Sequence, residues 1–262
     1  MPNIHPTAIV SSKAEIGENT TVGAYAFIED DVIIGSNCTI MNHASILDGS
    51  RIGNEVRIHQ SAVISGLPQD LKYAGEKTTC HVGDRTVIRE FATLNRGTDD
   101  KWKTVIGADN LIMAYVHIAH DVITKDKVIL ANSVQVAGHC EIGFHVTIGG
   151  MTPVHQFVRI GDHAFIGGGL RVHKDVPPYV LAMGEPLGYG GLNKVGLERR
   201  GFSVETREEI QKAYRTLYHS GLIRSDAIER IKDEQEMIPE IETLIAFIES
   251  SERGTITAKR RT

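Results

Sequence analysis

Residues 128–148 read VILANSVQVAGHCEIGFHVTI, and every sixth residue of this stretch is aliphatic: Leu130, Val136, Ile142 and Ile148. The same series runs from residue 4 to residue 172, and 25 of its 29 positions are Ile, Val or Leu. The exceptions are Asp70, Glu76, Asp100 and Thr124. The overall hydrophobic content of 41% would give only about 12 matches by chance. A period of six fits neither an amphipathic helix nor an alternating strand, and it is typical of the hexapeptide repeats of a parallel β-helix.

Each hexad supplies a short strand and a corner, so three hexads form one coil of about 18 residues. A β-sandwich with irregular spacing would not keep one phase over this length, and we therefore set it aside. Two excursions, residues 65–81 and 95–105, leave the series without changing its phase. We expect both to form external loops, because a segment that interrupts a solenoid lies outside its core.

The pattern changes after the repeat ends near Val172. From about Ser203 the apolar residues recur at intervals of three and four, as in an amphipathic helix. Ser203 is a suitable N-cap and Gly221 a suitable stop for this helix. Further helices are expected over residues 226–233 and 239–250.

The chain therefore divides into two predicted domains. The parallel β-helix spans residues 1–185, with external loops at about 65–81 and 95–105. An α-helical domain follows over residues 186–262. The tail from residue 254 is polar, and we expect it to fray.

The composition limits the function and the compartment. The chain has 28 Lys and Arg against 33 Asp and Glu, whereas a general nucleic-acid binder normally has a basic footprint. No apolar run is long enough to span a membrane, and the amino terminus lacks the features of a signal peptide. Cys38, Cys80 and Cys140 lie too far apart to suggest a disulfide framework or a metal cluster. We expect a cytoplasmic protein with no nucleic-acid partner and no membrane span.

Several histidines fall on the later coils. Residues 18 apart lie on adjacent coils, about 4.8 Å apart, so His120 and His139 are predicted to be near neighbours. His117 shares a coil with His120, and His155 lies further along. Imidazole suits both proton transfer and metal binding, although any one of these side chains could simply be a hydrogen-bonded surface group. No nucleophile elbow, P-loop or dinucleotide fingerprint accompanies them.

Six motifs carry a resemblance to a known family: PQDLKYAGE (68–76), HIAHD (117–121), VAGH (136–139), GGMTPVHQF (149–157), DVPPY (175–179) and RRGF (199–202). Over essentially its full length the chain resembles the UDP-N-acetylglucosamine acyltransferases of lipid A synthesis. The first motif is specific to this branch of the hexapeptide transferases. The resemblance implies a left-handed β-helix and a cytoplasmic homotrimer with active sites between subunits. Such a trimer moves a 3-hydroxyacyl chain from acyl carrier protein to the sugar 3-OH of UDP-N-acetylglucosamine, without a cofactor or a metal.

The resemblance also assigns catalytic roles. His120 matches the general base that takes the proton of the attacking 3-OH. Gly138 matches the position whose backbone N–H faces the developing oxyanion. Asp121 follows the base, but neighbours on a strand face opposite ways, so it would reach the base only through a bend at a corner.

The implied substrate contacts form a larger set. Asp70 matches a contact near the sugar 3-OH, and Lys72, Arg199 and Arg200 have the charge that a diphosphate needs. The full set is Gln69, Asp70, Leu71, Lys72, His117, His139, His155, Gln156, Asn193, Arg199 and Arg200. Gly150 and Gly168 match the acyl-chain pocket. A glycine at position 168 leaves this pocket long, so we expect a donor of the 3-hydroxymyristoyl kind.

Two positions depart from the family pattern. Asn95 stands where a histidine is common, and Val195 stands where an acidic residue would contact the nucleotide. An acceptor with a 3-amino group in place of the 3-OH therefore stays open.

Three other functions are also open at this point. The first is a hexapeptide-type carbonic anhydrase, which holds zinc between subunits through three histidines. The second is the related N-acyltransferase of the same pathway. The third is a catalytically inert trimeric scaffold, since a solenoid needs no active site to fold.

Overall fold

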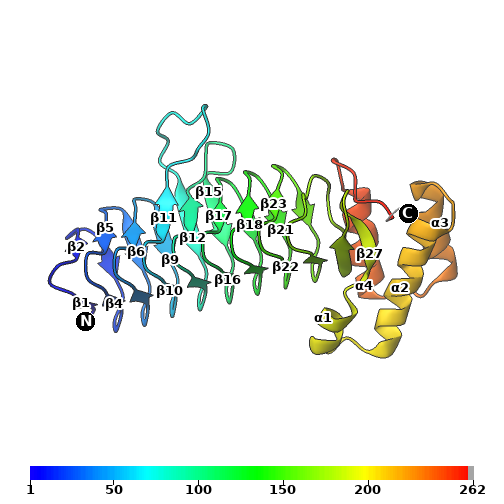
Figure 1. Ribbon diagram of the computed structural model, residues 1–262, viewed down its shortest axis with the longest axis horizontal. Helices are drawn as coiled ribbons and strands as arrows, with labels where there is room; N and C mark the ends of the chain where they lie inside the picture. Colours follow the sequence, from blue (N-terminus) through cyan, green and yellow to red (C-terminus); the bar gives the residue numbers. More distant parts are fainter. Residues whose placement is uncertain (259–262) are drawn as a thin grey trace.

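The computed structural model describes residues 1–258 and shows a long three-sided coil that ends in a group of helices (Figure 1). The N-terminus lies at one end of the coil and the helices lie at the other. Strands of successive coils pair in parallel, so each side of the coil is one sheet. The fold is the predicted left-handed parallel β-helix followed by an α-helical region.

The three sides are called the first, second and third sheets, and the strand counts refer to the described residues. The first sheet holds 11 strands: β1 (Asn3–Ile4), β4 (Thr21–Val22), β7 (Thr39–Ile40), β10 (Arg57–Ile58), β13 (Val87–Ile88), β16 (Leu111–Ile112), β19 (Ile129–Leu130), β22 (Thr147–Ile148), β25 (Phe165–Ile166), β26 (Val180–Met183) and β27 (Gly188–Leu192). The second holds 8: β2 (Ile9–Val10), β5 (Phe27–Ile28), β8 (Ser45–Ile46), β11 (Val63–Gly66), β14 (Thr93–Asn95), β17 (His117–Ile118), β20 (Gln135–Val136) and β23 (Pro153–Val154). The third also holds 8: β3 (Glu15–Ile16), β6 (Val32–Ile34), β9 (Ser50–Ile52), β12 (Thr79–Val82), β15 (Lys103–Ile106), β18 (Ile123–Thr124), β21 (Glu141–Ile142) and β24 (Arg159–Ile160). The predicted domain boundary at 185/186 lies in the turn between β26 and β27 and stays a prediction.

The aliphatic residues of the hexad series fill the inside of the coil. Ile118 pairs with Val136 and Val136 with Val154 on successive coils. All three side chains are buried, and each such burial stabilises the fold by about 1.5–3 kcal/mol. The period of six thus arises because the same position of each hexad must face the core.

The corners are turned by single residues in the left-handed region of the backbone. Tyr115, Asp121 and Lys127, which lie on three successive corners, have φ values of 61°, 59° and 58°. This conformation reverses the direction of the chain between two sheets. It also breaks the strand alternation, so side chains at corners can lie beside those of the preceding residue.

Two external loops interrupt the coil, as predicted (Figure 1). The first joins β11 to β12 and the second joins β14 to β15. They protrude on the same side of the coil. Asn95 Nδ2 donates to Leu67 O (3.0 Å) and Arg96 Nε donates to Ser65 O (3.0 Å), so the bases of the two loops are joined.

Four helices lie in the described part of the C-terminal region: α1 (Lys194–Arg199), α2 (Val204–His219), α3 (Arg224–Glu234) and α4 (Pro239–Glu249). Ser203 caps α2 by accepting from Thr206 N (3.1 Å), and Gly221 follows its end with a φ of 79°. The predicted helices and their boundary signals are therefore confirmed. Within residues 1–258, every helix falls short of the length and apolarity needed to cross a membrane.

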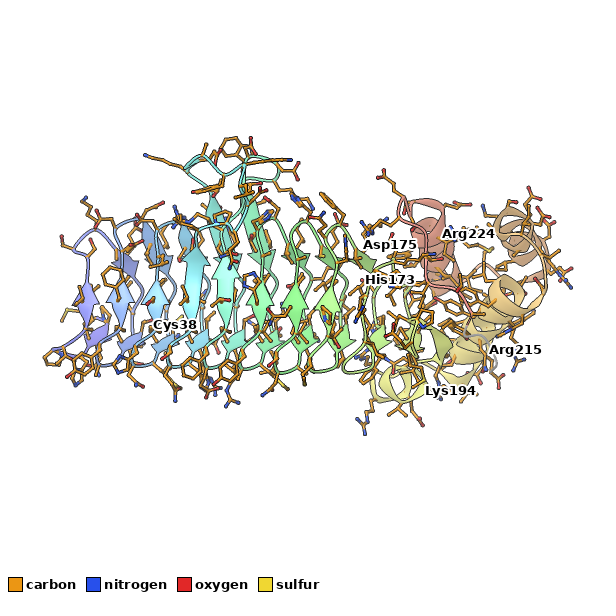
Figure 2. All side chains as sticks on the ribbon, turned by 45° about the horizontal axis from the view of Figure 1, so that its top comes forward. Cys38, His173, Asp175, Lys194, Arg215 and Arg224 are labelled. Carbon is orange, nitrogen blue, oxygen red and sulfur yellow. The ribbon has the colours of Figure 1, made fainter. Side chains whose placement is uncertain are left out.

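The expectation that the tail frays from residue 254 is wrong for the part that the structure describes. Thr255 and Ile256 are buried, and Ile256 N donates to Asp175 O (2.9 Å). Figure 2 shows Asp175 at the junction where the C-terminal segment lies against the end of the coil. This backbone pairing holds the segment despite its polar composition, and the rest of the predicted tail, 259–262, lies outside the described residues.

Candidate active site

His120 and Asp121 lie at the corner between the second and third sheets, and Ala119 separates them from the end of β17. The positive φ of Asp121 turns the chain there, and its carboxylate therefore lies beside the preceding imidazole. His120 Nδ1 is 2.9 Å from Asp121 Oδ2. The bend that the sequence required for this pair is present.

The Asp121 carboxylate is fully buried and surrounded by donors. Its Oδ1 accepts from Thr98 N (3.0 Å) and Lys101 N (3.3 Å), and its Oδ2 accepts from Thr98 Oγ1 (2.6 Å). Burial alone would raise the pKa of this carboxyl, but hydrogen bonds from Thr98 and His120 outweigh burial and hold the pKa below its usual value. An ionised carboxylate can only accept, so Nδ1 of His120 carries a proton, and in the neutral ring Nε2 has the free lone pair.

His120 lines a groove of about 380 Å³ on the second sheet. Gln69, His117, Gly138 and Gln156 are among the other lining residues. A Cβ placed on Gly138 would lie 2.7 Å from His120 Cε1. A side chain at position 138 would thus displace the imidazole, so only glycine keeps both the ring and the groove in place.

Two further imidazoles lie close to His120. His139 packs edge-on against it with centroids 5.0 Å apart, and its Nδ1 is 3.0 Å from Asp100 Oδ2. His117 Nδ1 is 2.8 Å from Thr93 Oγ1, and burial, with the nearby charge of His120, lowers its pKa. Donor atoms of His120, Asp121 and His139 lie within 4.8 Å of one another and could hold a metal ion. The predicted proximity of His120 and His139 is therefore confirmed, whereas His155, the fourth histidine of the predicted group, lies beside Arg253.

Asn193, Arg199 and Arg200 lie elsewhere, in a groove of about 1030 Å³ between the first sheet and α1. Asn193 caps α1 by accepting from Gly196 N (3.2 Å), and its Nδ2 donates to His163 O (2.9 Å). Arg200 Nη1 is 3.2 Å from His163 Nδ1. Burial, and then the Arg200 charge, lowers the pKa of His163 to about 4. His163 is therefore neutral near pH 7 and can accept from the guanidinium.

The other predicted site residues are spread over the coil. Asp70, Leu71 and Lys72 belong to the first external loop, where Leu71 is fully exposed. Gly150 and Gly168 lie on corners between the first and second sheets, and the exposed His155 interacts with Arg253 through its Nδ1 (3.2 Å).

One chain does not bring the two grooves together within the described residues. Figure 1 shows α1 and the external loops on opposite sides of the coil. In Figure 2, turned by 45°, Lys194 at the start of α1 again lies opposite the loops. The groove that contains His120 opens on the second sheet, whereas the Arg199–Arg200 groove opens on the first.

Sequence reasoning missed Thr98, Asp100 and His163. Thr98 and Asp100 lie in the second external loop, outside the hexad series, so periodicity could not place them against His120 or His139. The loop's position immediately before the coil of His120 was the available signal. Of the two departures from the family pattern, Asn95 is buried at the joined base of the loops, and Val195 is exposed at the edge of the Arg199–Arg200 groove.

Two family models match parts of the chain. One is described as "Udp N-acetylglucosamine O-acyltransferase; Domain 2" and covers residues 175–256. The other is described as "Bacterial transferase hexapeptide (six repeats)" and covers residues 31–66. Their positions agree with the helical region and the coil.

Similar proteins cover nearly the whole chain. An acyl-[acyl-carrier-protein]–UDP-N-acetylglucosamine O-acyltransferase of Herminiimonas arsenicoxydans is 48% identical over 98% of this chain and 100% of its own length. One of Thiobacillus denitrificans is 45% identical with the same coverage. The crystal structure of a UDP-N-acetylglucosamine acyltransferase from Bacteroides fragilis matches with a TM-score of 0.95 and 46% identity, covering 96% of this chain and 99% of that one. The chain belongs to the UDP-N-acetylglucosamine O-acyltransferase family.

Proposed function

We propose that this chain transfers an (R)-3-hydroxyacyl chain from acyl carrier protein to the 3-OH of UDP-N-acetylglucosamine, the first step of lipid A biosynthesis, in the cytoplasm. The full-length relatives are named for an acyl-carrier-protein-dependent O-acyltransferase. The observation that supports the catalytic part is the His120–Asp121 pair at the wall of a groove. This family membership favours acyl transfer over the carbonic anhydrase, N-acyltransferase and scaffold alternatives.

His120 acts as the general base in this proposal. Asp121 holds the proton on Nδ1, so Nε2 takes the proton of the 3-OH as its oxygen attacks the thioester carbonyl. The C–O bond forms, the C–S bond of the thioester breaks, and the imidazolium returns the proton to the leaving sulfur. Attack is direct, which agrees with a sequence that has no nucleophile motif.

Gly138 serves the carbonyl side of the reaction. Its carbonyl accepts from Phe157 N (3.1 Å), which fixes the orientation of the backbone next to the base. We assign its N–H as the donor to the oxyanion, since a preorganised backbone donor stabilises the charge that develops there. The missing side chain leaves room for the thioester beside His120.

The acceptor is held by groups on both sides of the base. Asp70 Oδ2 lies 4.0 Å from His120 Nε2, close enough to orient a sugar hydroxyl between them. Arg199 and Arg200 supply the positive charge for the diphosphate. Because His163 beside it is neutral, Arg200 keeps its positive charge available for the ligand.

We further propose that the site is completed between the subunits of a homotrimer. The His120 and Arg200 grooves lie on different faces of one coil, so a neighbouring copy must bring them together. An exposed apolar corner between the first and second sheets supports a subunit contact. Its members Tyr25, Phe91, Tyr115 and Met151 are 60%, 48%, 58% and 75% exposed. Apolar side chains repeated along one edge are typical of a covered surface.

Subunit complementation tests the shared site. His120→Ala and Arg200→Ala trimers are each expected to be strongly impaired, because every site lacks one of the two groups. Mixed trimers formed by co-expression should regain activity, to about a quarter of the wild-type rate at equal amounts, since that fraction of sites receives both groups. The measurement is acyl transfer by co-purified, differently tagged subunits, with sedimentation equilibrium to verify the trimer.

The matched control is a mixed trimer formed by co-expression of the His120→Ala and Asp121→Asn chains. Both changes lie in the same half of the site, so no mixed site is complete and activity should stay low. Equal recovery in the two mixtures, or a monomer in sedimentation, would contradict the shared site.

Gly168→Met is expected to shift donor preference to shorter chains. A Cβ at Gly168 meets Gly150 O at 3.1 Å, so a longer side chain must extend away from this wall into the pocket that the resemblance assigns here. The measurement is kcat/KM for a ladder of 3-hydroxyacyl donors with UDP-N-acetylglucosamine, which also identifies the natural length. Glu15→Met, at an exposed position of β3 in the first coil, is the control. An unchanged length profile in the Gly168 variant would show that the pocket ends elsewhere.

A further inference from the structure

Donor atoms of His120, Asp121 and His139 lie within 4.8 Å of one another next to the catalytic groove, and Asp100 adds a carboxylate beside His139. Asp121 Oδ2 lies 2.9 Å from His120 Nδ1 and 3.9 Å from His139 Nδ1. His139 Nδ1 in turn lies 3.0 Å from Asp100 Oδ2. These atoms come from one corner, from the corner of the next coil and from the second external loop.

Three separations among these donors are close to those of a tetrahedral metal site, and a rotation of Asp100 would bring its carboxylate in as the fourth ligand. A zinc ion with bonds of about 2.0–2.2 Å to nitrogen and oxygen separates neighbouring ligand atoms by about 3.3 Å. The three measured separations, 2.9, 3.9 and 3.0 Å, fall on both sides of that value. Two imidazoles and two carboxylates are a donor set that zinc accepts, whereas magnesium and calcium prefer oxygen ligands.

We propose that His120, His139, Asp121 and Asp100 bind Zn²⁺, and that the bound ion inhibits acyl transfer. The single proton of the neutral His120 ring would move from Nδ1 to Nε2, and the ion would take the lone pair that this leaves on Nδ1. With its proton on Nε2, the ring cannot accept the proton of the 3-OH. The inhibitory part rests on the proposed function of His120 as a base, whereas the binding part does not.

The surroundings allow the ion to enter without rebuilding the corner. Asp100 is 57% exposed at its side chain, so its carboxylate can rotate toward the ion. Asp121 Oδ2 keeps its bond from Thr98 Oγ1 (2.6 Å), because a carboxylate oxygen has two lone pairs. The ring of His139 is fixed by stacking on Phe157, with centroids 4.5 Å apart. A cleft of about 580 Å³, lined in part by Asp100, His139 and Phe157, opens the site to solvent.

Titration calorimetry of the tag-free protein with zinc chloride tests the binding part. We expect one ion per chain. His139→Ala should weaken binding by about 100-fold and Asp100→Asn by about 10-fold, in line with loss of a ligand or of its support. His59→Ala is the matched control, because its Nδ1 also pairs with a carboxylate oxygen, Glu90 Oε1, at 3.2 Å outside the cluster. Melting temperatures verify that each variant is folded.

Zinc affinity that is unchanged in both cluster variants, or reduced equally by His59→Ala, would overturn the site. Absence of binding to the unaltered chain would do the same. Magnesium chloride in place of zinc should show no binding here, and equal binding of both ions would contradict the assigned donor set.

Activity measurements test the inhibitory part. Zinc should abolish acyl transfer at the concentrations that saturate the calorimetric site, and EDTA should restore it. Asp100→Asn should keep the metal-free rate and need about 10-fold more zinc for half-inhibition. Zinc that saturates the site and leaves transfer unchanged would show that His120 Nδ1 is not a ligand. A failure of the proposed function would look different, because the metal-free chain would then be inactive while calorimetry still reported the site.

Discussion

Replacing His120 with alanine is expected to lower kcat for acyl transfer by about 10²–10⁴-fold, the usual contribution of a general base. A secondary alcohol is a weak nucleophile near neutral pH, so its attack on the thioester depends on simultaneous loss of its proton. Asp121 holds the proton of His120 on Nδ1, and this leaves Nε2 free to accept the hydroxyl proton. The measurement is the initial rate with UDP-N-acetylglucosamine and a long 3-hydroxyacyl donor, at saturating concentrations of both.

The same variant should stay folded. His120 lies outside the inward hexad series, and Asp121 keeps its bonds from Thr98 and Lys101 when the imidazole is removed. We therefore expect a small change in melting temperature and an unchanged oligomer. His59→Ala removes a comparable imidazole–carboxylate pair elsewhere on the coil and should keep the full rate. Near wild-type turnover in the His120 variant would remove the base from the mechanism.

The coil could be predicted almost entirely from the sequence. The narrow three-sided core takes an aliphatic side chain at the same position of each hexad, so the pattern that Ile118, Val136 and Val154 continue is a direct record of the fold. The external loops were visible for the same reason, as gaps at Asp70, Glu76 and Asp100 in an otherwise continuous series. The tail was mispredicted because polar composition does not reveal backbone pairing, such as that between Ile256 and Asp175.

The histidines and the aspartate of the candidate site could be predicted from the sequence. The residues that hold them in place could not. The length of about 18 residues per coil placed His139 beside His120. The alternation of side chains along a strand meant that Asp121 could reach the His120 ring only if the chain bends there. The structure supplies that bend as a positive φ at Asp121. Thr98, by contrast, reaches Asp121 from a loop whose course no repeat dictates. The location of Arg200 could not be derived either, since its groove depends on how α1 folds back on the first sheet.

Asp121→Asn is expected to lower kcat by about 10³-fold with little loss of stability, by changing which nitrogen of His120 carries the proton. The carboxylate accepts from four donors, and two of them, Thr98 N and Lys101 N, are backbone groups that can only donate. The amide oxygen of asparagine must therefore stay with these two. Its NH₂ group then points at Thr98 Oγ1 and His120 Nδ1.

Thr98 and His120 can each accept a hydrogen bond from this NH₂ group, but the change that His120 must make lowers catalysis. The Thr98 hydroxyl rotates and accepts. The imidazole accepts at Nδ1 only by moving its proton to Nε2, which is the atom that must take the proton of the 3-OH. Nitrogen-15 shifts of the His120 ring should report this exchange of tautomers directly, alongside the fall in rate. Asp100→Asn makes the same chemical change beside His139 and should leave both the His120 tautomer and kcat as they are. A variant in which His120 carries its proton on Nε2 and turnover stays at the wild-type rate would contradict this mechanism. A protonated nitrogen cannot accept the hydroxyl proton, so the base would then have to be a group other than His120.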